Sequence, residues 1–215
     1  MGVNRHQDYA YIGNAVPNNL HWLDVKKMRD AGFRIIRSAH YPQDPAFMDA
    51  CDELGMFIIV ATPGWQYWNP EPVFEERILS DIRNMVRRDR NHPSVLLWEP
   101  VLNETAFPES FAQNAYRATH EEYPAPGCYA AIDDKSKGAM GYDVVYTAPK
   151  NEAFYRNAGK SCFTREYGDC VDDWNSHNSY SRVAREWGEE PQIRQAQHYA
   201  RKDCLLYTSP SPRDG

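Results

Sequence analysis

Short apolar runs rich in β-forming residues alternate along the chain with longer segments of helical periodicity, and this alternation constrains the fold most. The strand candidates are residues 2–6, 33–37, 56–61, 95–98, 128–132, 143–146 and 162–165. Strands separated by helices pair in parallel, because a parallel pair needs a long crossover connection. The sequence therefore predicts an α/β fold, with a (β/α)₈ barrel as the leading architecture and a doubly wound open sheet as the alternative.

Two further observations distinguish these architectures. No GxGxxG motif follows any strand candidate, so a dinucleotide-binding open sheet has little support. The chain has 215 residues and seven strand candidates, whereas a complete TIM barrel typically needs about 250 residues and eight βα units. We therefore expect an incomplete TIM barrel, with about seven of its eight units.

Three helices are predicted between the first four strands. Asn19 is expected to cap the first helix, which ends at Gly32. Pro45 suits the first turn of the second helix, which ends before Gly55. The third carries an apolar series at helical spacing, formed by Phe74, Ile78, Ile82 and Met85. The three βα units between residues 104 and 166 are compact, so the helices after the fifth and sixth strands must be short or missing.

Composition excludes several classes of partner. The 24 basic and 30 acidic residues give a net charge of −6, which provides no basic face for nucleic acid. No apolar run approaches the roughly 20 residues that span a bilayer, so we expect no membrane partner. The five cysteines show no CxxC pair and no spacing typical of a metal site.

Two glutamates stand where catalysis occurs in a parallel barrel. Asn103 and Glu104 follow the fourth strand candidate, and Glu166 follows the seventh. The carboxyl ends of all strands open onto one face of such a barrel. Two carboxylates on that face can cleave a glycosidic bond: one protonates the leaving oxygen, and the other attacks the anomeric carbon from about 5–5.5 Å in retaining enzymes. A single glutamate at a strand end is more often a partner in a salt bridge.

Several ordered motifs carry a family resemblance. They are GVNRH at residues 2–6, IRSAHYP at 36–42, CDELG at 51–55, RDRNHPS at 88–94, Asn103-Glu104, and EYG at 166–168. Together they resemble the barrel domain of glycoside hydrolase family 2, which includes β-galactosidases, β-glucuronidases and β-mannosidases. The resemblance covers about residues 2–190, and the ordered set is specific although each motif alone is weak.

The resemblance implies a role for five residues. Glu104 matches the acid/base, and Asn103 matches the asparagine that binds the 2-hydroxyl of the sugar. Glu166 matches the nucleophile. Arg37 matches an arginine that pairs with the nucleophile, and Tyr146 matches a tyrosine that hydrogen-bonds to it. For Arg37 the alternative is an ion pair inside the barrel.

The resemblance also implies a sugar pocket and tests it for metal. His6 and His40 match histidines that face the sugar, although His40 could instead cap the turn that follows it. Trp65 could stack on a sugar ring or pack within its loop. Residues 61–66 carry no carboxylate or imidazole, so we expect no magnesium site of the kind found in metal-dependent members, and no cofactor.

We therefore expect a retaining β-glycosidase that hydrolyses terminal β-linked sugars by double displacement, with β-galactosides as the leading substrates. The alternatives are a β-glucuronidase or β-mannosidase of the same family, and an inactive or carbohydrate-binding barrel fragment. Residues 1–203 are interpreted as a partial barrel domain, and residues 204–215 as an artefactual or disordered tail. The β-sandwich domains that precede the barrel in this family are expected in the full-length protein.

Overall fold

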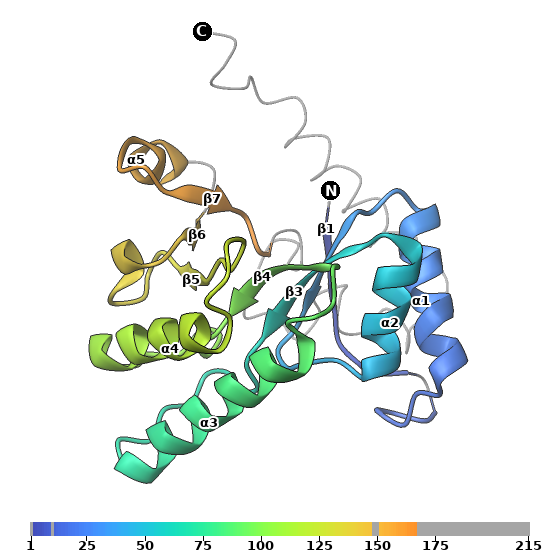
Figure 1. Ribbon diagram of the computed structural model, residues 1–215, viewed down its shortest axis with the longest axis horizontal. Helices are drawn as coiled ribbons and strands as arrows, with labels where there is room; N and C mark the ends of the chain where they lie inside the picture. The colour runs from blue at the N-terminus through green and yellow to red at the C-terminus, as the bar shows by residue number, and fades with distance from the viewer. Residues whose placement is uncertain (1, 10, 148–150, 167–215) are drawn as a thin grey trace, which may run out of the picture. The chain divides into compact units, whose positions relative to one another are not determined.

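The computed structural model describes residues 2–9, 11–147 and 151–166. The chain divides into two compact units, Met1–Arg165 and Glu166–Gly215. All helices and strands named below belong to the first unit (Figure 1). None of the helices in the described part of the chain is long and apolar enough to cross a membrane.

In the described residues, seven parallel strands follow one another in the order of the sequence. The first sheet contains β1 (Gly2–Arg5), β2 (Ile35–Ser38), β3 (Phe57–Ala61) and β4 (Val95–Glu99). The second contains β5 (Ala131–Asp133), β6 (Val144–Tyr146) and β7 (Ser161–Phe163). A parallel bridge between Trp98 and Ala130 joins β4 to the start of β5. The predicted α/β fold with parallel strands is confirmed.

Helices connect the strands and lie outside them (Figure 1). They are α1 (Asn18–Asp30), α2 (Pro45–Leu54), α3 (Pro72–Asp89), α4 (Glu109–Glu122) and α5 (Glu152–Asn157). Only the single 3₁₀ turn Ala139–Gly141 separates β5 from β6. The prediction of short or missing helices after the fifth and sixth strands is confirmed.

The ends of α2 show how local sequence sets a helix. The side chain of Asp44 accepts a hydrogen bond from the backbone N–H of Ala46 at 2.8 Å, and Pro45 occupies the first turn. Gly55 ends the helix in the left-handed conformation, with φ of 66°, which costs glycine little because it has no Cβ.

The predicted cap of α1 is wrong. Asn19 lies inside the helix, and Pro17 occupies the cap position without a side-chain hydrogen bond. The carbonyl of Pro17 already accepts hydrogen bonds from the backbone N–H groups of Leu20 and His21, at 2.9 and 3.3 Å. The helix therefore begins with its cap two residues before Asn19, the residue that suggested a cap.

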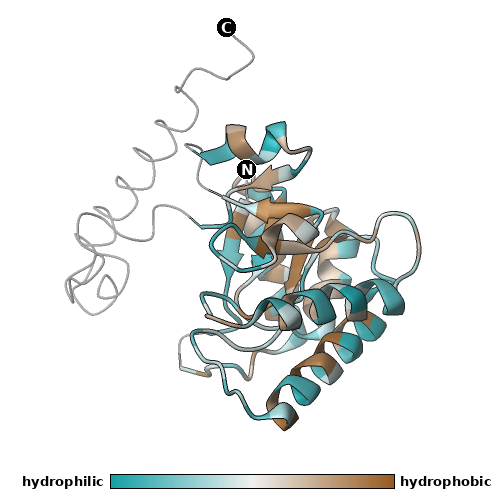
Figure 2. Ribbon diagram, turned by 90° about the vertical axis from the view of Figure 1, so that its left-hand side faces the viewer, coloured by the Kyte–Doolittle hydropathy of each residue, from teal (hydrophilic) through white to brown (hydrophobic). Residues whose placement is uncertain are grey.

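Strand β3 is buried on both faces, and its side chains alternate between them. Ile58 and Val60 of β3 belong to a core shared with α1 and α2. Ile59, between them, packs on the opposite face with Leu97 and Tyr146. Strand segments accordingly appear hydrophobic, whereas the outer faces of the helices appear hydrophilic (Figure 2). Burial of side chains of this size contributes about 1.5–3 kcal/mol each.

Polar and charged side chains lie at the carboxyl ends of the strands. Because the strands are parallel, their carboxyl ends lie at the same side of each sheet. Arg37 lies near the end of β2, and Glu99, Asp133 and Tyr146 are the last residues of β4, β5 and β6. Arg165 follows β7 by two residues. The site is built on these ends.

Candidate active site

A buried ion pair joins the ends of β2 and β4. Arg37 donates from Nε to Glu99 Oε2 at 2.7 Å and from Nη2 to Oε1 at 2.6 Å. Both side chains are almost fully buried, at 3% and 2% exposure. Two parallel hydrogen bonds hold the planar guanidinium and the carboxylate in one relative orientation. Arg37 is therefore a fixed part of the floor of the site.

The charge of Arg37 controls the ionisation of its partner. Burial alone would raise the pKa of Glu99, but the charge and hydrogen bonds of Arg37 outweigh it and hold the pKa below its ordinary value. The hydroxyl of Tyr146 donates to Glu99 Oε2 at 3.3 Å. Burial, followed by the negative charge of Glu99, raises the pKa of Tyr146 well above its ordinary value. Glu99 is thus the anion and Tyr146 a neutral donor.

Glu104 lies on the loop after β4, held against the loop after β3. Gln66 donates from its backbone N–H to the carbonyl of Asn103 at 3.0 Å and from Nε2 to Glu104 Oε2 at 2.7 Å. A parallel bridge between Trp65 and Asn103 continues this pairing. Gln66 and Glu104 both have positive φ, of 57° and 49°, a conformation that is uncommon outside glycine. Gln66 therefore holds the carboxyl group of Glu104, and the backbones of the two loops are paired beside it.

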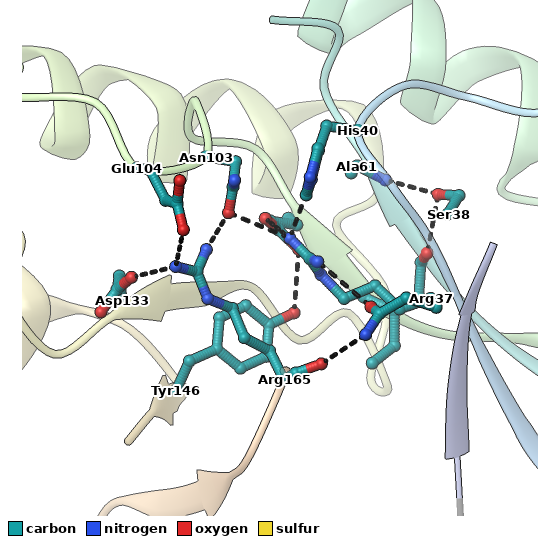
Figure 3. Close-up of polar contacts among 12 residues, drawn as sticks. Arg37, Ser38, His40, Ala61, Asn103, Glu104, Asp133, Tyr146 and Arg165 are labelled. Carbon is teal, nitrogen blue, oxygen red and sulfur yellow. Dashed lines mark hydrogen bonds and ion pairs between the residues drawn. The ribbon is translucent and has the colours of Figure 1, made fainter. Parts of the chain in front are cut away.

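Arg165 links four strand ends at the same place (Figure 3). Its Nη2 lies 2.5 Å from Asp133 Oδ2 and 4.0 Å from Glu104 Oε1. Its Nη1 donates to Asn103 Oδ1, and its backbone carbonyl accepts from Asn4 Nδ2 of β1 at 3.0 Å. Burial raises the pKa of Asp133, and the charge of Arg165 opposes that rise.

Aromatic rings line the neighbouring loops. The ring centroids of His6 and His40 are 5.5 Å apart, and those of His40 and Trp65 are 5.7 Å apart. The Nδ1 atom of His40 is 3.4 Å from Arg37 Nη2, so its ring contacts the floor of the site. Trp65 is 49% exposed, as a ring available for stacking requires. Their contact with a sugar stays a prediction.

The structure brings most of the predicted residues into one site. Within the first unit it groups Arg37, His40, Asn103, Glu104 and Tyr146 through the contacts above. Glu166 is the first residue of the second unit. Its expected pairing with Arg37 and Tyr146 stays a prediction, and within the first unit both of these side chains contact Glu99.

Four contributors were missed by sequence reasoning: Gln66, Glu99, Asp133 and Arg165. Glu99 carried a usable signal, since a carboxylate that ends an apolar strand must be paired when buried. Gln66, Asp133 and Arg165 carried none that separates them from ordinary polar loop residues. In the described residues, no group of three His, Cys, Asp or Glu side chains could hold a metal ion.

Comparison with known proteins identifies the class. The model of the TIM barrel domain of glycosyl hydrolases family 2 matches residues 1–125. The chain therefore belongs to glycosyl hydrolase family 2, as its motifs predicted.

Individual relatives carry two kinds of name. The β-galactosidase of Thermoanaerobacterium thermosulfurigenes is 38% identical over 125 residues, which cover 57% of this chain and 17% of that protein. The putative β-glucuronidase of Formosa agariphila is 33% identical over 97 residues, or 45% of this chain and 12% of that protein. The chain thus spans less than a fifth of the length of either relative.

A solved structure agrees with the fold. The family 2 β-galacturonidase from Eisenbergiella tayi bound to galacturonate is similar over 92% of this chain and 40% of that chain, with a TM-score of 0.65 and 25% identity.

Proposed function

We propose that the complete protein is a retaining β-glycosidase that releases terminal β-linked sugars, with β-galactosides as its substrates. One observation carries the proposal: in a chain of family 2, Glu104 is held by Gln66 and Arg165 at the edge where the parallel strands end. A carboxyl group fixed at that edge, with its oxygens reachable from the strand ends, suits proton transfer to a glycosidic oxygen.

The reaction proceeds in two displacements. In the first, Glu104 gives its proton to the glycosidic oxygen while a carboxylate oxygen of Glu166 bonds to the anomeric carbon, and the aglycone leaves as an alcohol. In the second, Glu104 takes a proton from water, whose oxygen attacks the anomeric carbon and releases Glu166. Both carboxyl groups return to their initial states, and the anomeric configuration is retained.

The neighbouring residues prepare this chemistry. Asn103 donates to the 2-hydroxyl of the sugar, and the buried Arg37–Glu99 pair fixes the floor beneath it. The family resemblance leads us to expect Tyr146 and Arg37 near the nucleophile. His6, His40 and Trp65 provide rings that contact the apolar face of the sugar.

Charge supports a neutral sugar. A uronic acid needs a cation to bind its carboxylate. In the described part of the site, both arginines already contact carboxylates: Arg37 contacts Glu99, and Arg165 contacts Asp133. The β-galactosidase name of the 38% identical relative points in the same direction.

A uronidase is the second candidate, because a putative β-glucuronidase and a β-galacturonidase are among the similar proteins. A β-mannosidase would use the same mechanism, so a β-mannoside is the third substrate to test. A barrel fragment that only binds carbohydrate, or is inert, is the alternative from another class.

We further propose the architecture that this function needs. Residues 1–203 are proposed as a partial TIM-barrel domain of about seven units, and the full-length protein is proposed to add the rest together with β-sandwich domains. Residues 167–203 of that domain and the tail proposed for residues 204–215 lie outside the described residues.

The test uses the complete protein and three aryl glycosides: a β-galactoside, a β-glucuronide and a β-mannoside. Fastest hydrolysis of the galactoside is expected; faster hydrolysis of another glycoside would change the proposed substrate but keep the mechanism.

A 2-deoxy-2-fluoro glycoside should label Glu166, and labelling of another residue would contradict the role of Glu166 as the nucleophile. Glu104→Gln should abolish turnover of poor leaving groups while sparing activated aryl glycosides, and equal loss for both would contradict the acid role.

A further inference from the structure

The side-chain amide of Asn103 is oriented by two cations. Its Oδ1 accepts a hydrogen bond from Arg37 Nη2 at 3.3 Å and another from Arg165 Nη1. A guanidinium group can only donate hydrogen bonds. The amide atom that faces both arginines must therefore be the oxygen, so Nδ2 points away from them.

The amide nitrogen of Asn103 is accessible. Within the described residues, the only buried side-chain nitrogen or oxygen atoms without a partner are His21 Nε2 and Ser94 Oγ. No hydrogen bond from Asn103 Nδ2 occurs there, although Asn103 itself is 96% buried, with 4% of its surface exposed. Nδ2 is thus a donor that a ligand can reach, presented from an otherwise buried residue.

Arg165 is itself held rigidly. Asp133 contacts Nη2 at 2.5 Å, and Asn4 donates to the backbone carbonyl of Arg165 at 3.0 Å. The side chain is 13% exposed. It is therefore fixed from β1 and β5 while it bonds to the loop after β4 (Figure 3).

We propose that Arg165 is a positioning residue that sets the substrate preference of the enzyme for a sugar hydroxyl beside the anomeric carbon. Arg165 keeps Oδ1 of Asn103 turned inward, Nδ2 then donates to that hydroxyl, and Asp133 holds Arg165 in place. Arg37 alone leaves the amide with one long hydrogen bond. This inference rests on the proposed glycosidase function, in which Asn103 contacts the sugar.

The test compares two substrates of the complete protein: the aryl β-glycoside that it cleaves fastest and the 2-deoxy counterpart. The quantity measured is the ratio of their kcat/KM values. Arg165→Met should lower this ratio about tenfold, the value of one hydrogen bond, because only the hydroxylated substrate uses the oriented amide. Asp133→Asn should lower it less. A general folding defect would reduce both kcat/KM values equally. An unchanged ratio in Arg165→Met would therefore overturn the proposal.

Arg156→Gln is the matched control, since Arg156 pairs with Glu152 within the exposed helix α5 and, among the described residues, has no hydrogen bond to Asn103. It should leave the ratio at the wild-type value.

A crystal structure of Arg165→Met gives a readout besides activity. We expect the Asn103 amide to turn or to occupy two orientations; an unmoved amide would overturn the proposal even if no glycoside were hydrolysed. Loss of activity on replacing Glu104 or Glu166 tests the proposed function separately.

Discussion

Gln66 donates a hydrogen bond from Nε2 to Oε2 of Glu104 at 2.7 Å, and both residues have a left-handed backbone. Variants of Gln66 can remove the side-chain hydrogen bond while they tolerate the left-handed backbone. Gln66→Asn tolerates the positive φ but is one methylene too short, and Gln66→Gly keeps only the backbone. We expect both variants to lose about tenfold in kcat/KM for a poor leaving group, the value of one hydrogen bond. Wild-type activity in Gln66→Gly would contradict this. Gln113→Asn, on the exposed face of α4, is the control.

Breaking the buried pair should cost stability. Arg37→Met leaves the buried carboxyl group of Glu99 without its cationic partner, and we expect a loss of about 3–5 kcal/mol in stability. The double variant Arg37→Met/Glu99→Leu should recover part of that loss, because no lone charge remains buried. Urea unfolding measures both.

The control for this experiment is a surface pair. On α1, Lys26 Nζ lies 2.5 Å from Asp30 Oδ2, and the two side chains are 44% and 62% exposed. Lys26→Met should change stability by less than about 1 kcal/mol. A similar loss in Arg37→Met and Lys26→Met would show that the buried pair has no special weight.

Acidification should destabilise the protein through His21. This ring is fully buried, accepts at Nδ1 from Arg5 at 3.2 Å, and has no partner at Nε2. Burial, followed by the charge of Arg5, lowers the pKa of His21 below 6.5. The unfolded chain therefore binds a proton at a higher pH than the folded chain. Stability from this group is complete above about pH 6.5 and is lost as the pH falls below it.

His21→Gln removes this titration and keeps an acceptor for Arg5. The midpoint of thermal unfolding, measured between pH 5 and 8, should fall more steeply with acidification in the wild type than in the variant. Parallel curves would contradict the assignment.

Gly55 should resist substitution more than Gly141. Gly55 has φ of 66° at the end of α2, whereas Gly141 has an ordinary φ and open space where a Cβ would stand. Gly55→Ala should cost about 1–2 kcal/mol, and Gly141→Ala should be close to neutral. Thermal unfolding of both variants measures the difference, and equal midpoints would be inconsistent with a backbone effect.

The strands were predictable from sequence because each is a short apolar run between breaks in helical periodicity. All seven candidates are strands, with shifted ends: the second begins at Ile35 and the fifth at Ala131. The cap at Asn19 failed because the decisive acceptor was a backbone carbonyl, that of Pro17, which leaves no trace in side-chain chemistry.

Residues of the candidate site could be predicted only where they belong to a recognisable sequence motif. Ordered motifs pointed to Arg37, Asn103 and Glu104, which the structure brings together, and their roles stay predictions. The partners of Arg165 were not, because Asp133 and Asn103 reach it from different strands, at positions that depend on strand order and register. Pairing across three elements is a property of the packed structure and has no local pattern.

Strand order has a consequence for how the first unit is made. Each strand in a sheet pairs with its neighbour along the chain, from β1 to β4 and from β5 to β7, so each ladder closes one crossover connection. Because closure entropy grows with loop length, pairing only neighbours along the chain keeps that cost lower than pairing distant strands would. As the chain leaves the ribosome, each new βα unit finds its docking edge already synthesised, and assembly can keep pace with translation.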